Sequence, residues 1–323
     1  MLKFVDADEV AARLSWPIVI PLMRRAMADL SAGRTRQLLR EILPLRGDDL
    51  FGVMPGSLGD GRPFGAKLIS VLPRNFAAGG PSHQGVILLF DPESGAPVCV
   101  VDAGEVTALR TAAASAMATD VLARADASRL ALLGYGRQAE EHLHAIAHVR
   151  TLSSVVVWGR HAGRAAAFAS RMASEPAISR RGLRIHVAAD ARSAAAGADI
   201  VCTLTPATEP ILKGAWIAPG AHVNLVGAGH AGQAEADGAL VARARFFADS
   251  RPGVLTQGGE FRRALAEGLV DEGHIAGEIG EVLLGSVAGR RSGEEVTAYK
   301  SLGHIAQDLS CAEFLYSMAK SQG

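Results

Sequence analysis

A glycine-rich turn between an apolar strand and a helix-forming segment is the part of the sequence best suited to bind a ligand. In residues 128–139 the apolar run 130–133 is followed by the pattern G-x-G-x-x-A. Gly134 allows a tight turn, Gly136 lets the backbone approach a pyrophosphate, and Ala139 lets the helix pack closely on the strand. Free N–H groups at the start of that helix favour negative charge. We therefore predict a dinucleotide site formed by Gly134, Tyr135, Gly136, Arg137 and Gln138.

The next apolar run, 154–158, ends without a carboxylate. Sites for NAD usually place Asp or Glu there, where it accepts hydrogen bonds from the ribose 2′-hydroxyl. Here the run is followed by Gly159, Arg160 and His161. A guanidinium suits a 2′-phosphate. The sequence thus favours NADPH (NADP) as the cofactor, with NADH as the alternative.

Composition indicates a globular metabolic protein. The chain has 323 residues, 49% of them hydrophobic, which is enough for two domains. Its formal net charge of zero gives no reason to expect nucleic acid or a membrane surface as a partner. Three separated cysteines without C-x-x-C spacing predict buried thiols and no metal site. No apolar run approaches the roughly 18 residues of a membrane span, so we expect a cytoplasmic protein.

Apolar strands alternate with alanine-rich helices from residue 130 to about 252. This alternation predicts an α/β domain with a Rossmann-type, doubly wound parallel sheet. The expected strands are 130–133, 155–158, 185–188, 200–204, 221–226 and 244–248.

Residues 1 to about 115 follow another pattern. A helix is expected over 10–32, followed by strand-like pieces at 51–55, 65–71, 85–90 and 97–101 and a long helix over 103–123. Strands without intervening helices predict a mainly antiparallel sheet in a separate α+β domain. The segment 298–322 is expected to be helical, with apolar residues on one stripe.

Motifs spread along the whole chain resemble those of the ornithine cyclodeaminase/mu-crystallin family. They are G-A-K-L-I-S-V-L-P-R-N at 65–75, P-S-H-Q at 81–84, R-T-A-A-A-S-A at 110–116, G-Y-G-R-Q-A at 134–139, T-P-A-T-E-P-I at 205–211, P-G-A-H-V-N-L-V-G at 219–227 and Y-K-S-L-G at 299–303. The resemblance implies a homodimer built through the first-domain sheets, with the C-terminal helix returning to that domain. The implied domains are 1–116 with 304–323 for substrate binding and dimerisation, and 117–303 for NAD(P) binding.

The resemblance also implies roles for individual residues. Arg40 and Lys67 match the pair that grips the substrate carboxylate, with Lys67 nearest the reacting carbon as the catalytic residue; His83 completes this substrate site. Arg110 and Thr111 match residues that contact the substrate carboxylate or the cofactor pyrophosphate. Further matches line the nicotinamide end of the cofactor: Thr203, Thr205, Val226, Gly229, Lys300 and Ser301.

These residue types suit reduction of an α-imino acid. Such a substrate carries a carboxylate beside its C=N bond, so a fixed guanidinium and an ammonium would hold its C2 near nicotinamide C4. Orientation of this kind can supply on the order of 7–11 kcal/mol of the barrier. Lys67 could in addition donate a proton.

One position departs from the cyclodeaminase pattern. Cyclodeaminases place a catalytic Asp where this chain has Gly229, and a glycine cannot transfer a proton. The expected activity is therefore NADPH-dependent reduction of cyclic ketimines, such as Δ1-pyrroline-2-carboxylate and Δ1-piperideine-2-carboxylate, to L-proline and L-pipecolate. The alternatives are an alanine-dehydrogenase-like or reductive-amination enzyme acting on 2-oxo acids, an ornithine cyclodeaminase, and a non-catalytic NADPH-binding protein.

Overall fold

The computed structural model describes residues 2–77 and 80–321 and divides into two compact units. The first comprises Met1–Thr111 and Gly303–Gly323, and the second comprises Ala112–Leu302. Helix α4 (Ala103–Leu122) runs across the first boundary. The boundaries predicted from the sequence lie after residues 116 and 303. The separate functions predicted for the two domains remain a prediction.

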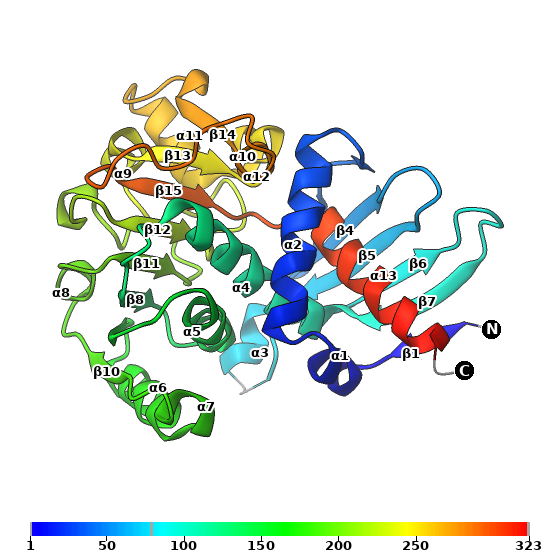
Figure 1. Cartoon of the computed structure of the whole chain (residues 1–323), viewed down its shortest axis with the longest axis horizontal. Coiled ribbons are helices and arrows are strands. Elements are labelled where there is room, and N and C mark those ends of the chain that lie inside the picture. The colour runs from blue at the N-terminus through cyan, green and yellow to red at the C-terminus, as the bar shows by residue number, and fades with distance from the viewer. Residues whose placement is uncertain (1, 78–79, 322–323) are drawn as a thin grey trace. The chain divides into compact units, whose positions relative to one another are not determined.

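The first unit is built on a seven-stranded sheet in the order β1-β7-β6-β5-β4-β2, with β3 also paired to β4 (Figure 1). Its strands are β1 (Lys3–Val5), β2 (Arg36–Gln37), β3 (Glu41–Pro44), β4 (Leu50–Ser57), β5 (Phe64–Val71), β6 (His83–Phe90) and β7 (Pro97–Asp102). The pair β1–β7 is parallel and the other pairs are antiparallel. This is the mainly antiparallel sheet expected from strands without crossover helices.

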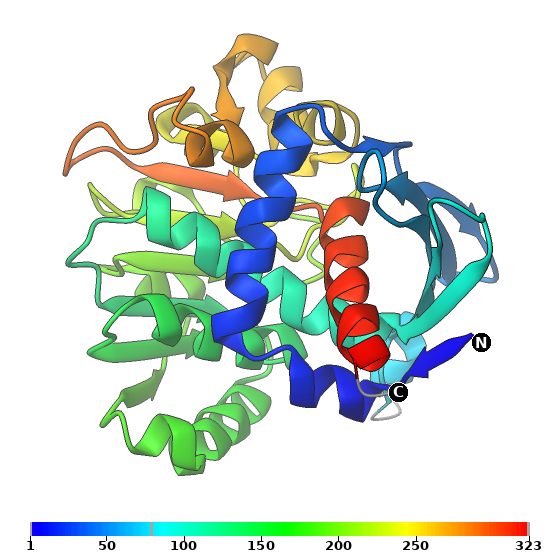
Figure 2. The same cartoon turned by 45° about the vertical axis from the view of Figure 1, so that its right-hand side comes forward.

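Helix α13 (Ile305–Ser321) covers one face of this sheet, and the described part of the first unit contains three further helices besides the start of α4. These three are α1 (Ala7–Arg13), α2 (Trp16–Ser31) and α3 (Pro73–Ala77). Helix α13 packs beside α2 and across β4, β5 and β6 (Figure 2). The helical segment expected over 10–32 is present as two helices, because the chain breaks at Leu14 and restarts with Ser15 as the N-cap of α2. Pro17 suits that first turn, since it lacks the N–H that a helix start leaves unpaired.

The second unit contains an eight-stranded sheet, parallel throughout, in the order β10-β9-β8-β11-β12-β15-β13-β14 (Figure 1). Its strands are β8 (Arg129–Leu133), β9 (Ser154–Trp158), β10 (Arg184–Val187), β11 (Ile200–Thr203), β12 (His222–Leu225), β13 (Arg245–Ala248), β14 (Ile275–Glu278) and β15 (Thr297–Lys300). The predicted Rossmann-type class is confirmed. The strand order reverses between β8 and β11, and ligands of such sheets bind at the carboxyl ends of the strands beside this point.

The helices of the second unit connect these strands. They are α5 (Arg137–Val149), α6 (Ala162–Ser174), α7 (Pro176–Ser179), α8 (Ala191–Ala195), α9 (Gly238–Arg243), α10 (Arg251–Gln257), α11 (Gly259–Ala266) and α12 (Ile279–Leu283), with 3₁₀ turns at Gly214–Trp216 and Glu272–His274. None of the helices within 2–77 and 80–321 is both long and apolar enough to cross a bilayer.

The helix predicted over 298–322 is wrong at its start. Thr297–Lys300 forms strand β15 between β12 and β13, and all four of its residues are buried. A strand covered on both faces has no alternation of polar and apolar residues to identify it. The helix itself begins at Ile305. Strand β14 was not anticipated either.

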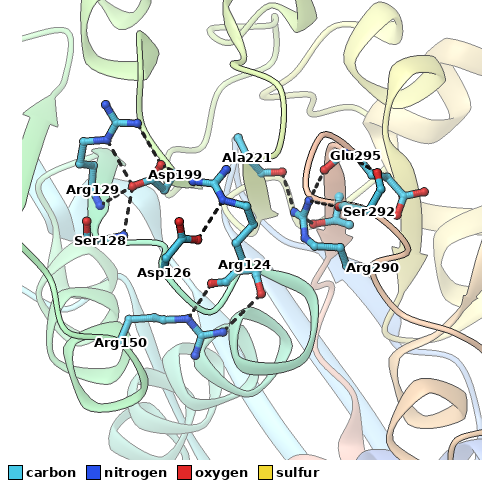
Figure 3. A network of polar contacts seen from close by, with 12 residues as sticks. Arg124, Asp126, Ser128, Arg129, Arg150, Asp199, Ala221, Arg290, Ser292 and Glu295 are labelled. Carbon is cyan, nitrogen blue, oxygen red and sulfur yellow. Dashed lines mark hydrogen bonds and ion pairs between the residues drawn. The ribbon is translucent and has the colours of Figure 1, made fainter.

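Asp199 fixes the amino-terminal ends of the two central strands β8 and β11 (Figure 3). Its carboxylate accepts hydrogen bonds from the backbone N–H groups of Ser128 and Arg129, and from the side chains of Arg129 and Arg124. These donors hold the pKa of Asp199 below its usual range, against the effect of burial. Asp199 therefore stabilises the amino-terminal edge of the sheet, which is opposite to the carboxyl edge where sheets of this type bind ligands.

We expect Asp199→Asn to lower the free energy of unfolding by about 1–3 kcal/mol at pH 7, because two backbone N–H donors and two partly exposed guanidinium groups lose a buried, charged acceptor. A carboxyl whose pKa is lowered by folding stabilises the protein above its unfolded pKa of about 4, and this contribution disappears as pH falls through the folded pKa. Urea denaturation from pH 7 to pH 3 measures the effect. The difference between wild type and variant should shrink in acid, and a constant difference would contradict this account.

Candidate active site

Lys67 is a buried ammonium on the helix-covered face of the first-unit sheet. Side chains alternate along β5. Those of Lys67 and Ile69 point to the covered face, on which Gly65 is also buried. Only 2% of the Lys67 side chain is exposed. Its Nζ donates to Thr107 Oγ1 of α4 at 2.7 Å and to Asp308 Oδ1 of α13 at 3.0 Å. The lysine is thus held by two helices that are about 200 residues apart in sequence.

Burial and neighbouring charges set the protonation of this lysine. Desolvation lowers the pKa of Lys67 to about 8; the carboxylate of Asp308 opposes this shift, while the cations Arg110 and Arg40 add to it. The side chain is therefore mostly protonated at pH 7 and loses its proton within the range of ordinary assays.

Arg110 of α4 is the second buried cation of this cluster. Its Nε donates to the same atom, Asp308 Oδ1, at 3.2 Å, and its Nη1 donates to Gln307 Oε1 at 3.0 Å. A Cβ at Gly303 would lie 2.6 Å from Nη1, so the glycine makes room for the guanidinium. Burial alone would raise the pKa of Asp308, but Arg110 and Lys67 lower it below its usual range. Asp308 is therefore an ionised carboxylate shared by two cations.

Two further predicted substrate residues lie at the margin of the cluster. Arg40, half-buried just before β3, is near enough to lower the pKa values of Lys67 and His83. His83 begins β6, and its Nδ1 lies 2.9 Å from Ser82 Oγ. Desolvation and the positive charges of Lys67, Arg110 and Arg40 lower the pKa of His83 to about 4, so the ring is neutral at pH 7. Thr111, also on α4, donates its hydroxyl to Thr107 O at 2.6 Å.

The glycine turn of the second unit has the geometry that its sequence predicts. Gly134 has φ 142°, and a Cβ there would lie 2.8 Å from Leu204 O, so no other residue fits without strain. Gly136 is the N-cap of α5, and a Cβ on it would meet no described atom within 4 Å. Ala139 is fully buried against the strand. The backbone at Gly136 therefore combines open space with a helix start, the arrangement that suits a pyrophosphate.

The end of β9 offers a second anion-binding surface. Arg160 and His161 are exposed, and His161 is the N-cap of the 13-residue helix α6 without a side-chain cap hydrogen bond. The first turn of α6 contains no acidic residue. Gly159 faces the ring of Tyr135, so a larger side chain would collide with the ring. The guanidinium of Arg160 and a helix start thus lie at the end of β9, where the ribose end of a dinucleotide is expected.

Glu235 joins the chain segments that leave β11 and β12. One oxygen accepts from the N–H and hydroxyl of Thr205 at 2.6 and 2.7 Å. The other accepts from the hydroxyl of Thr203 and the N–H of Gly227 at 2.7 Å each, and from the N–H of Ala228 at 3.2 Å. These segments contain Thr203, Thr205 and Val226, which were predicted to line the nicotinamide end. The hydroxyls of both threonines are directed to this buried carboxylate.

Lys300 and Ser301 follow at the end of β15. Lys300 is fully buried, donates to Ala228 O at 2.7 Å and pairs with Glu260 at 2.9 Å. Ser301 Oγ is buried and has no hydrogen-bond partner among the described residues. Gly229 donates its N–H to Gln233 Oε1 at 3.0 Å, and a Cβ on Gly229 would meet no described atom within 4 Å. Lys300 therefore holds the segment that follows β12 through its hydrogen bond to Ala228 O.

Several residues of these clusters were missed by the sequence analysis. They are Thr107, Gln307 and Asp308 in the first unit and Glu235 and Glu260 in the second. Asp308 offered a signal, since it lies between Ile305 and Leu309 on the apolar stripe of a helix. Such a residue needs a buried partner. Within the described residues, no group of three His, Cys, Asp or Glu side chains is arranged to hold a metal ion.

Residues 3–323 match the ornithine cyclodeaminase/mu-crystallin family. The chain belongs to this family. It is 34% identical over 318 residues to the ketimine reductase mu-crystallin of Mus musculus, an alignment that covers 97% of this chain and 96% of the mouse protein.

Solved structures agree with this assignment. The Δ1-pyrroline-2-carboxylate reductase of Thermococcus litoralis, in complex with NADH and L-proline, has a TM-score of 0.94 and 33% identity, covering 100% of this chain and 98% of the other. An archaeal alanine dehydrogenase dimer with bound NAD has a TM-score of 0.91 and 28% identity, covering 99% and 97%.

Proposed function

We propose that this protein is an oxidoreductase acting on CH–NH bonds, which uses a nicotinamide dinucleotide to reduce cyclic α-imino acids. Δ1-Pyrroline-2-carboxylate and Δ1-piperideine-2-carboxylate would give L-proline and L-pipecolate. The observation that carries this proposal is the buried cation cluster around Lys67. Support also comes from the reductases of the same family, one of them in complex with NADH and L-proline.

The cluster carries an excess of positive charge, which a substrate carboxylate would neutralise. Lys67 and Arg110 contribute two positive charges, and the one carboxylate that pairs with both of them, Asp308, compensates one. Burying unpaired charge is costly, so an anionic group bound beside these residues would be stabilised. A 2-imino carboxylate brings one negative charge next to the carbon that must accept hydride.

The reaction needs a hydride for carbon and a proton for nitrogen. A bound, reduced nicotinamide would supply the hydride to the imine carbon; the C=N π electrons would then become the nitrogen lone pair, and the nitrogen would carry or gain a proton. Lys67, with a pKa of about 8, is an ammonium at neutral pH and can orient the carboxylate or supply that proton. Because two of its three N–H groups are engaged by Thr107 and Asp308, the third is available to substrate.

Gly229 favours this reaction over cyclodeamination. The position has space for a side chain but carries no group that could accept a proton from a substrate amine. Reductive amination of a 2-oxo acid is the second candidate, because the chain is similar to an alanine dehydrogenase. Pyruvate with ammonia as substrate distinguishes the two reductions.

We propose NADPH as the preferred cofactor. The exposed guanidinium of Arg160 precedes a helix start without acidic residues, which suits a 2′-phosphate better than a pair of ribose hydroxyls.

We also propose that the protein forms a homodimer in the cytoplasm through the uncovered face of the first-unit sheet. Exposed apolar side chains gather on this face: Phe4 is 71% exposed, Leu43 60%, and Phe64 and Val86 38% each. Phe64 stacks on Phe90 across the β5–β6 pair. Several exposed apolar side chains on one sheet face are typical of an interface, and the similar alanine dehydrogenase is a dimer.

Replacing Lys67 by Met should lower kcat/KM for Δ1-pyrroline-2-carboxylate by about 10²–10⁴-fold, because the charge and the proton donor are lost while the volume is kept. NADPH oxidation measures the rate, and Lys213→Met, on an exposed lysine of the second unit, serves as the matched control. Unchanged turnover in Lys67→Met would refute the assigned role, and no turnover by the wild type would refute the proposed substrate.

Wild-type protein should use NADPH in preference to NADH, and Arg160→Ala should raise KM for NADPH about tenfold or more, as expected for loss of a charge-assisted hydrogen bond. KM for NADH should change by less than about twofold. Arg180→Ala removes another exposed arginine of the same basic segment and should leave both values unaltered. An equal effect of Arg160→Ala on both cofactors would contradict recognition of the 2′-phosphate.

Sedimentation velocity at micromolar concentration should show twice the chain mass for the wild type. A charge placed on the apolar face, as in Val86→Lys, should shift the protein toward monomer, because an ammonium would be desolvated in the interface. Lys substitution at the exposed Val187 of the second unit is the control. A monomeric wild type would exclude the proposed interface.

A further inference from the structure

A single carboxylate oxygen organises the cation cluster. Asp308 Oδ1 accepts from Lys67 Nζ at 3.0 Å and from Arg110 Nε at 3.2 Å. The other oxygen, Oδ2, is buried and has no hydrogen-bond partner among the described residues. All of the hydrogen bonding of this aspartate is therefore directed to two residues that the proposed reaction uses.

Thr107 supplies the second anchor of the lysine. Its hydroxyl donates to Ala103 O at 2.5 Å, so its oxygen is left to accept from Lys67 Nζ. An ammonium has three N–H groups in tetrahedral directions. Two fixed acceptors, one on α4 and one on α13, determine the direction of the third.

We propose that Asp308, together with Thr107, is a positioning residue for imino-acid reduction, which holds Lys67 as an ammonium with its third N–H directed to the substrate. This inference rests on the proposed function. It gives the C-terminal helix α13 a role in positioning Lys67, although no residue of this helix belongs to the predicted substrate site.

The charges around Lys67 explain why a carboxylate is needed there. Groups that face the lysine come from every neighbouring element: Asp308 and Cys311 from α13, Arg110 from α4, His83 from β6 and Arg40 from the segment before β3. His304, ahead of α13, faces Asp308 and Arg110. In this set Asp308 carries the negative charge, and it therefore opposes deprotonation of Lys67.

The proposal predicts a pH dependence with a definite sign. Reduction requires Lys67 protonated, so kcat/KM should fall as pH rises through the lysine pKa of about 8. Removing the charge of Asp308 removes the contribution that raises this pKa. Activity should then be lost at a lower pH, with a shift of about one to three units.

Asp308→Asn separates charge from geometry. The amide oxygen can replace Oδ1 as acceptor for Lys67 and Arg110, and the amide nitrogen takes the place of Oδ2, where no bond is broken. The ratio of kcat/KM for Asp308→Asn to that of wild type is measured from pH 5.5 to pH 9 with Δ1-pyrroline-2-carboxylate and NADPH. Ionisation of the substrate is common to both proteins and cancels in this ratio.

For a shift of one to three units, the expected ratio lies within about fivefold of one at pH 5.5 and falls at least about fivefold further by pH 8.5. A ratio that is reduced equally at every pH, or that stays at one, would overturn the proposal, because a purely structural role does not follow the protonation of Lys67.

The Thr107 pair tests the same geometry if Asp308→Asn does not fold. Thr107→Val removes the second acceptor and should lower kcat about tenfold, whereas Thr107→Ser keeps the hydroxyl and should restore kcat to within about twofold. Wild-type kcat in Thr107→Val would equally overturn the proposal.

Competitive acetylation of Lys67, read by mass spectrometry as a function of pH, reports its protonation without any turnover. Its midpoint should move to lower pH in Asp308→Asn. If the wild type reduces no imino acid but this midpoint moves, the proposed function has failed while Asp308 still controls the lysine. If the wild type turns over and the midpoint is unmoved, the role of Asp308 has failed.

Discussion

The need to compensate buried charge governs both units of this protein. A cation or carboxylate transferred into a protein interior loses much of its hydration free energy, and it is retained only where partners replace the water. In the first unit Asp308 is shared by Lys67 and Arg110. In the second, Lys300 pairs with Glu260, and Glu235 accepts five hydrogen bonds from the ends of two strands. Functional residues therefore have fixed directions before any ligand arrives.

The charged groups around Glu235 and around Lys67 are compensated to different extents. Glu235 is surrounded by donors, so the segments after β11 and β12 are held rigidly at the edge where the strand order reverses. Around Lys67 the positive charges exceed the negative ones. The hydrogen bonds of Glu235 are all made without a ligand and preserve the shape of the second unit. The excess positive charge around Lys67 is not compensated within the cluster and would attract an anion. Both arrangements fit the proposed reduction, in which the second unit would support the cofactor and the first would bind a substrate carboxylate.

The sequence predicted what depends on local patterns. The strand–turn–helix at Gly134 and Gly136 and the parallel sheet followed from periodicity and glycine spacing, and Lys67, Arg40 and Arg110 from motifs. Thr297–Lys300 was assigned to a helix, because a strand buried on both faces shows no alternation. Asp308 was missed because its partners are distant along the chain; the Lys67–Asp308 contact spans 241 residues. Contacts of that separation are set by tertiary packing, which no local pattern records.

The first unit is interrupted in sequence by the whole of the second, and this has a consequence for biosynthesis. Strand β5 and the first half of α4 leave the ribosome early, whereas α13 is the last element to be made. Until α13 emerges, Lys67 and Arg110 lack the carboxylate that permits their burial. The parallel sheet can form meanwhile, since all eight of its strands precede α13. A nascent chain stalled near its end would thus contain a folded dinucleotide-binding sheet beside an open, positively charged first unit, a state in which chaperones and proteases would find the apolar face of that unit.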